Sequence, residues 1–213
     1  MFLFLQRKSQ EPRGKSVILS FQVSVININD ENNWIHLNIS DKKQYFSVLK
    51  AIETENNKQI QIYSENYDLL DISKKFNFIG NPIVSYNINE QYIPKIRKWI
   101  WEQVNPIQKE QFQTLAREFA KNIERELFLL NLPVTIDFEA DYIYLLKAFN
   151  LHIEPDAISE PYDIIYLIMK LHSIFNSESI LCLNDLANYL DENELKELKK
   201  ESSLMKIKMI LIN

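Results

Sequence analysis

The sequence predicts an α/β protein in which a sheet domain contains an inserted helical block. Alternating or continuous apolar runs, typical of strands, occur towards both ends of the chain. Between them, residues 89–131 have apolar side chains spaced by three and four, as in a helix with one buried face. Strand and helix signals alternate at both ends, which indicates a layered α/β fold. We therefore expect a discontinuous α/β domain over residues 1–88 and 160–213, and a helical domain over residues 89–159.

The first domain segment is expected to start with a strand, because apolar residues alternate from Val17 to Val25. Ser40 is the expected N-cap of a helix with Asp41 in its first turn. The residues of this helix that are expected to point inward are Phe46, Leu49, Ala51 and Ile52. The other expected elements are a strand over 17–28, a turn at 29–33, a strand over 34–39, a helix to about 52, a strand over 59–63 and an extended stretch closed by Gly80-Asn81-Pro82.

The middle of the chain is expected to be helical, with Asn105-Pro106 separating a helix at about 90–103 from a longer one. One buried stripe is predicted on the long helix, formed by Phe112, Leu115, Phe119, Ile123, Leu127 and Leu130. The remaining predictions are an extended piece over 134–138, helices over 139–150 and 163–176, a strand over 180–183, a charged helix over 191–203 and a strand over 205–212.

Composition limits the classes of protein. The chain has 213 residues, two glycines, one cysteine and a formal net charge of −5. Two glycines exclude a glycine-rich phosphate loop, and a single cysteine excludes an intrachain disulfide, which fits a reducing cytoplasm. An apolar run of 18 residues is absent from the sequence, so we expect no contact with a membrane and a cytoplasmic location. The acidic excess is concentrated in residues 132–163, so basic patches that bind DNA are possible elsewhere.

Gly14-Lys15-Ser16 matches the end of a phosphate-binding loop, G-x-x-x-x-G-K-[ST]. The first glycine of that motif would stand at Ser9, and a strand rather than a helix follows. The turn between the second strand and its helix also has no glycine, and Asp41 would repel phosphate there. We therefore expect a sheet of nucleotide-binding architecture without a nucleotide site.

Carboxylates gather in the segment TIDFEAD, where Asp137, Glu139 and Asp141 alternate. Hard cations such as calcium are bound by several carboxylate oxygens. An EF-hand is excluded, because its sixth position is Tyr142 and its twelfth is Ala148. An irregular calcium site, shared with another subunit or with Glu124 and Glu126, is one interpretation; an acid-rich helix start is the other.

Basic residues interleaved with aromatic ones can bind nucleic acid. Trp99 and Trp101 follow Lys95, Arg97 and Lys98, but a helix with one buried tryptophan and a basic solvent face gives the same pattern. The pairs Lys42-Lys43 and Lys74-Lys75 are equally open to both interpretations. The three histidines, His36, His152 and His172, are far apart in the sequence and do not have the spacing of metal ligands, so we expect them to be structural. We expect Cys182 to lie in a buried strand.

Residues 59–212 resemble a known family. The segments on which the resemblance rests are IERELFLL with IDFEADYIYLLKAFNLHIE, then YDIIYLIMKLHSIF, then ILCLNDLANYLDENELKEL, together with FIGNPIVSYNINEQYIPKI. Their order and spacing resemble the ring-forming spacer-acquisition protein of type II-A CRISPR systems. Residues 1–16 look like an addition to the family pattern, and the end at MILIN falls where the family usually has a further helix and strand.

The resemblance implies a P-loop-like α/β domain without nucleotide chemistry, and an added helical domain. It also implies a non-enzymatic, tetrameric ring that binds double-stranded DNA ends in a basic channel, is supported by calcium, and acts with the CRISPR integrase and effector nuclease. On this basis the expected calcium ligands are Asp137, Glu139 and Asp141, then Glu124 and Glu126, and the expected DNA-binding residues are Lys42, Lys43, Lys74, Lys75, Lys95 and Lys98. The alternatives are a protein-interaction adaptor without DNA binding, and a nucleotide-dependent enzyme that uses Lys15 and Ser16.

Overall fold

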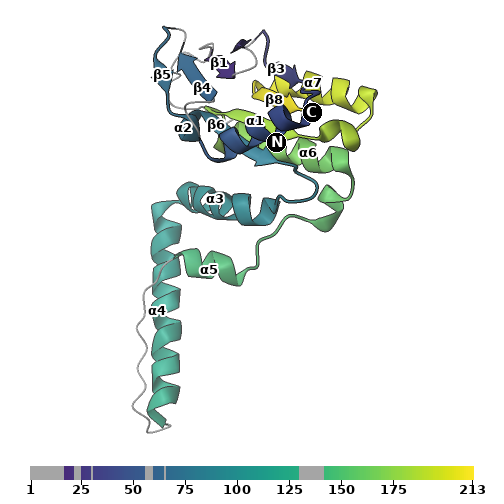
Figure 1. Cartoon of the computed structure of the whole chain (residues 1–213). Helices are drawn as coiled ribbons and strands as arrows, with labels where there is room; N and C mark the ends of the chain where they lie inside the picture. Colours follow the sequence, from purple (N-terminus) through teal and green to yellow (C-terminus); the bar gives the residue numbers. More distant parts are fainter. Residues whose placement is uncertain (1–16, 22–24, 30, 56–59, 65, 130–141) are drawn as a thin grey trace. The chain divides into compact units, whose positions relative to one another are not determined.

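The computed structural model describes residues 17–21, 25–29, 31–55, 60–64, 66–129 and 142–213. The chain divides by contacts into two compact units, one formed by residues 1–86 and 155–213 and one by residues 87–154 (Figure 1). The domain boundaries expected from the sequence remain a prediction.

The first unit combines eight described strands with helices on both sides of a parallel sheet. Its elements in chain order are β1 Val17–Phe21, β2 Val25–Ile28, β3 Trp34–Leu37, α1 Lys42–Glu53, β4 Ile60–Ser64, β5 Leu69–Leu70, α2 Ile72–Lys75, β6 Phe76–Gly80, η1 Pro155–Ile158, α6 Pro161–Phe175, β7 Ile180–Asn184, η2 Leu186–Asn188, α7 Glu192–Met205 and β8 Lys208–Ile212.

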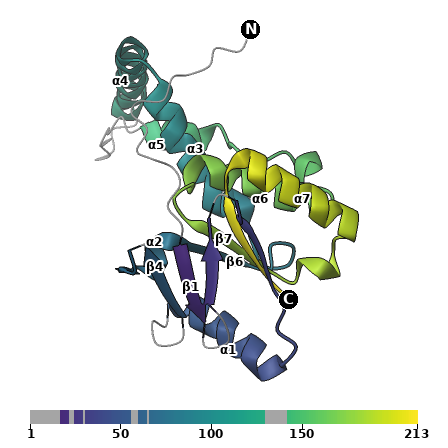
Figure 2. The ribbon, with the colours of Figure 1, turned by 90° about the horizontal axis from the view of Figure 1, so that it is seen from above.

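The centre of this unit is a parallel sheet with the strand order β3-β8-β7-β6. All five side chains of β7 are buried, as expected for a strand covered on both faces. On one face, Cys182 and Ile210 join a core cluster with Val48 and Ile52 of α1 and Ile62 of β4. Figure 2 shows α6 and α7 on the opposite face. The fold class is therefore mixed α/β, as predicted.

The second sheet is antiparallel, with the order β2-β1-β4-β5. The single strand predicted over residues 17–28 is wrong, because β1 and β2 pair with each other, Val17 opposite Ile28. The alternation of apolar residues continues through the reversal, and the sequence has no glycine, proline or asparagine there to indicate a turn. The turn at 29–33 is confirmed: the Asn29 side chain accepts hydrogen bonds from the backbone N–H groups of Glu31 and Asn32.

Two details of α1 differ from the prediction. Asp41, not Ser40, is the N-cap: its carboxylate accepts a hydrogen bond from the Lys43 backbone N–H at 3.0 Å. Phe46 is 65% exposed rather than inward, whereas Val48, Ala51 and Ile52 carry the packing of the helix. Tyr45 and Leu49 are partly buried and pack against the same core, so the covered face of α1 points away from Phe46.

The second unit contains the helices α3 Ile88–Gln103, α4 Pro106–Leu129 and α5 Tyr142–Ala148. A reciprocal capping box starts α4: Asn105 Oδ1 accepts from the Gln108 N–H, and Gln108 Oε1 accepts from the Asn105 N–H. Next to this corner, the rings of Trp101 and Phe112 pack edge to face, with centroids 6.1 Å apart. The proline break predicted at Asn105-Pro106 is therefore confirmed.

The buried stripe predicted on the long helix is wrong. Leu115 and Phe119 are 65% and 67% exposed, Ile123 is 38% exposed, and Ala120 is the buried residue of α4. Phe112 and Leu127 are half-buried, and Leu130 lies outside the described residues. The spacing correctly placed these side chains on one face, but in the described chain no partner covers that face.

Among the described helices, none has the length and apolar content needed to span a bilayer.

Candidate nucleic-acid interface

Lys42 and Lys43 form the first turn of α1 and are exposed. No described carboxylate lies within 4.0 Å of either ammonium group. They follow the carboxyl end of β3, so they lie at the carboxyl edge of the parallel sheet. Both ammonium groups are therefore available to an anion at that edge.

Lys74 and Lys75 end α2, immediately before β6 begins. The Lys74 ammonium lies 3.6 Å from the Asp71 carboxylate, in an exposed pair. Asp71 also caps α2, and its hydrogen bond from the Ser73 hydroxyl is the main cause that lowers the pKa of Asp71. Because the strands are parallel, this lysine pair lies at the amino edge of the sheet. The two lysine pairs of the first unit are thus at opposite ends of the strands.

Lys95 and Lys98 lie on α3 in the second unit, and both are exposed. The Lys95 ammonium is 5.2 Å from the centroid of the Tyr92 ring, and partial desolvation lowers the pKa of Lys95. Trp99 is 45% exposed, whereas Trp101 packs on Phe112 and is covered by the Lys109 ammonium at 5.0 Å. Trp99 is therefore the tryptophan of this helix that is available for stacking on a base.

A further group of basic side chains was missed by the sequence reasoning. Lys196, Lys199 and Lys200 lie on α7 and are exposed, and Lys206 follows the helix. Lys196 pairs with Glu192 at 3.7 Å. Lys199 lies close enough to His36 of β3 to contribute to lowering the pKa of that histidine, after the larger effect of partial desolvation. The signal was present in the segment KELKKESSLMKIK, which was interpreted as a charged helix without a surface being assigned to it.

The predicted calcium ligands Asp137, Glu139 and Asp141 lie outside the described residues. Glu124 and Glu126 are exposed on α4. They are two positions apart, so a helix directs them to different sides and they do not form a joint ligand pair. In the part of the chain that the structure describes, no three acidic, histidine or cysteine side chains form a metal cluster. The calcium site remains a prediction.

Residues that could carry catalysis are placed in structural roles. Cys182 is fully buried in β7, and burial raises the pKa of its thiol well above the usual range, which disfavours the thiolate. His172 is also fully buried: its Nδ1 lies 3.1 Å from Asn77 Nδ2, and its Nε2 lies 3.0 Å from the Ser179 carbonyl oxygen. Lys15 and Ser16 lie outside the described residues, and Val17 starts a strand as predicted.

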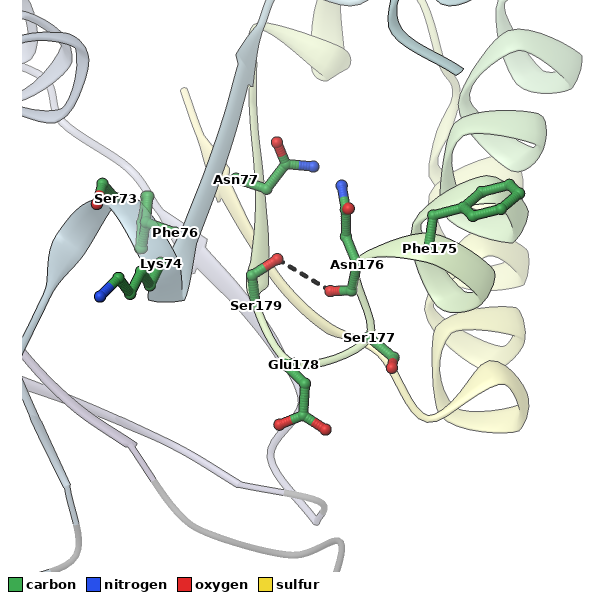
Figure 3. A pocket seen from close by; sticks show the side chains of 9 residues that line it. All are labelled: Ser73, Lys74, Phe76, Asn77, Phe175, Asn176, Ser177, Glu178 and Ser179. Atoms are coloured by element: carbon green, nitrogen blue, oxygen red, sulfur yellow. Dashed lines mark hydrogen bonds between the residues drawn. The ribbon is translucent and has the colours of Figure 1, made fainter. Parts of the chain in front are cut away.

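An open pocket of about 340 Å³ lies at the amino edge of the parallel sheet, where β6 and β7 begin (Figure 3). Its lining is mostly polar and consists of Ser73, Lys74, Phe76, Asn77, Phe175, Asn176, Ser177, Glu178 and Ser179. The Ser179 hydroxyl donates to the Asn176 carbonyl oxygen at 2.9 Å, which fixes one wall. Lys74 brings a cation to this pocket and Glu178 an anion, so its charge is mixed.

The comparisons with known proteins agree with the fold. The model of the CRISPR-associated protein family Cas_Csn2 matches residues 53–213. A crystal structure of Stu0660 of Streptococcus thermophilus is similar, with a TM-score of 0.56 and 10% sequence identity over 93% of this chain and 68% of that chain. At this identity the likeness shows a shared fold. No curated protein sequence matches the chain. Because the family model covers most of the sequence, the chain belongs to the Csn2 family of CRISPR-associated proteins.

Proposed function

We propose that this protein binds the ends of double-stranded DNA without reading sequence, as a non-enzymatic tetrameric ring that works in CRISPR spacer acquisition. Membership in the Csn2 family carries the proposal, because this family acts in CRISPR adaptation and is not known for catalysis. Its partners would be DNA, further copies of the chain, and the CRISPR integrase and effector nuclease. Calcium is proposed as the ion that supports the ring, with the carboxylates of segment 137–141 as its ligands.

Exposed lysines support DNA binding. The Lys42-Lys43 pair is unpaired among the described residues, and Lys98 is exposed on α3. Lysine contacts to phosphates release counterions and carry no sequence information, which suits a protein that must accept any invading DNA. The protein's negative net charge does not oppose this, because the acidic excess is concentrated in one short stretch.

The uncovered face of α4 supports self-association. Leu115, Phe119 and Ile123 follow each other at intervals of four along the helix, and all three are exposed. Such a row packs against a matching row of another helix at about −50°. A ring assembled from identical copies would supply that second helix.

The test is a gel shift that compares linear with covalently closed duplex of equal length, first with calcium and then with excess chelator. A ring that threads onto ends binds the linear form, and it loses that binding with the chelator. Equal binding to both forms would overturn the ring. Absence of binding to either would overturn the DNA function and leave the adaptor, for which the uncovered α4 face would be the docking surface.

Charge reversal then identifies the DNA-binding edge. Lys42→Glu with Lys43→Glu changes the carboxyl edge of the sheet, and Lys74→Glu with Lys75→Glu changes the amino edge. We expect one double variant to lower affinity at least tenfold and to reduce the salt slope by about 2, since each lost phosphate contact changes it by about 0.9. Gln113→Glu, exposed on α4, is the control for added negative charge. Unchanged affinity in both double variants would remove these four lysines from the interface.

A nucleotide-dependent enzyme is the weakest alternative. The turn where a phosphate would sit in a nucleotide-binding sheet is Ile39-Ser40-Asp41, and the Asp41 carboxylate already occupies the Lys43 N–H. Magnesium and ATP are therefore expected to leave the melting temperature unchanged, whereas a bound nucleotide would raise it.

A further inference from the structure

Three polar side chains form a closed hydrogen-bond network at the carboxyl edge of the parallel sheet. The Tyr45 hydroxyl of α1 donates to Asp185 Oδ1 at 2.6 Å. Asn184 Nδ2 donates to Asp185 Oδ2 at 2.7 Å and to the Tyr45 hydroxyl oxygen at 3.1 Å. Asp185 takes a left-handed conformation with φ 61°, and its N–H donates to the Ile212 carbonyl oxygen at 3.0 Å. The end of β7 is thus fixed against α1 and β8.

The network leaves one buried oxygen acceptor without a hydrogen-bond partner among the described residues. Asn184 is 6% exposed, and its Oδ1 is buried with no hydrogen-bond partner among the described residues. Rotating the amide by 180° would not relieve this, since it would place Oδ1 against Asp185 Oδ2. Asp185 receives its hydrogen bonds from neutral groups, and no described cationic side chain lies within 4.0 Å of its carboxylate. A buried amide oxygen without a hydrogen-bond partner and a carboxylate without a described cationic partner therefore belong to neighbouring residues at this edge.

The position is one where α/β sheets bind ligands. Open sheets bind them outside the carboxyl ends of parallel strands, where the following segments leave towards opposite faces. Here β3 leads into α1, which packs on the same face as Cys182, and β7 leads towards α7 on the other face (Figure 2). Strand β8 lies between β3 and β7 in the sheet. Asn184 Oδ1 faces Gly80 at the end of β6; a Cβ added there would lie 3.7 Å from this oxygen, and the φ of +75° favours glycine.

We propose that this edge binds a hard divalent cation of the calcium type, through Asn184 Oδ1 and the Asp185 carboxylate, with Tyr45 as a positioning residue. All available donors are oxygens, so the site suits calcium or magnesium rather than zinc or copper. A single carboxylate makes it a weak site in which water molecules complete the coordination. The site shares no residue with segment 137–141 and does not depend on the proposed DNA function.

Terbium luminescence tests the proposal, because tyrosine excites terbium ions bound close to it and terbium replaces calcium at oxygen sites. The full chain carries Asp137→Asn, Glu139→Gln and Asp141→Asn as a background, so that the other predicted metal site does not contribute. Saturable emission that calcium competes away is expected in this background. Glu192→Gln, an exposed carboxylate at the start of α7, is the matched control and should leave the emission unchanged.

Two variants then locate the ion. Asp185→Asn should weaken terbium binding at least tenfold. Asn184→Asp adds a second carboxylate and should tighten it at least tenfold, a gain that misfolding cannot produce. Circular dichroism melting checks that both variants are folded. The proposal is overturned if the background protein gives no saturable emission, if Asp185→Asn binds like its parent, or if Asn184→Asp fails to bind more tightly. Failure here leaves the gel-shift result untouched, so the two proposals fail separately.

Discussion

Strand β7 and helix α4 were both predicted from apolar patterns, yet they differ completely in burial. All five side chains of β7 are buried, whereas one of the 24 residues of α4 is. Layers on both sides cover β7, namely α1 with the second sheet on one face and α6 with α7 on the other. In the described chain, the start of α4 packs through Phe112 against the Trp101 ring, and the face that carries Leu115, Phe119 and Ile123 is uncovered. Periodicity thus predicts which residues share a face, and tertiary structure decides whether that face is covered.

The largest effect expected from this difference is on folding stability. Leu183→Ala removes a fully buried side chain from β7 and should lower the free energy of unfolding by about 3 kcal/mol, since it leaves a cavity. Leu115→Ala, at a position that is 65% exposed, should change it by about 0.5 kcal/mol or less. Urea unfolding of both variants at low protein concentration measures the two values. Equal losses would mean that the α4 face is covered within a single chain.

The sequence was most informative where burial itself produces the pattern. The continuous run from Ile180 to Leu183 predicted β7 correctly, and the alternation after Trp34 predicted β3. It failed where a short or local contact decides the structure. The two-residue strand β5 and the four-residue helix α2 lie within segments that have too few residues for a period to appear.

The next effect concerns assembly. Phe119→Glu places a charge in the uncovered row of α4, so it should weaken self-association at least tenfold, which corresponds to about 1.4 kcal/mol. The unfolding free energy of the single chain should remain unchanged, because Phe119 is 67% exposed. Light scattering after gel filtration measures the molar mass against concentration. Gln113→Glu adds the same charge at an exposed position two residues before Leu115 and should assemble like the parent. If both variants assemble normally, α4 is not the contact surface.

The candidate sites show the same limit of sequence reasoning. The lysine pairs were visible as pairs, but their placement at opposite edges of the parallel sheet follows from topology, which no local spacing encodes. Tyr45 and Asp185 are 140 positions apart, and their hydrogen bond exists because α1 and the end of β7 meet in the fold. Asp185 lies in the family-like segment ILCLNDLANYLDENELKEL, but no local spacing relates it to Tyr45. The orphaned oxygen of Asn184 becomes apparent only when all its neighbours are placed.

The smallest effect on stability is expected at the edge strand of the parallel sheet, which is intermediate in burial between β7 and α4. His36 is exposed on the edge strand β3, and partial desolvation, followed by repulsion from the Lys199 ammonium, lowers its pKa below the usual 6.5. The folded state therefore binds fewer protons than the unfolded state near that pH, and stability rises with pH there. The contribution of His36 is fully present above pH 6.5 and is lost as the pH falls through the folded-state pKa. His36→Gln should flatten this part of the stability profile, measured by urea unfolding between pH 5 and 7.5.

Lys199→Met should flatten the same part of the profile only partly, because desolvation is the larger cause of the lowered pKa of His36. A profile that Lys199→Met removes entirely would show that charge, not desolvation, sets the pKa at this edge.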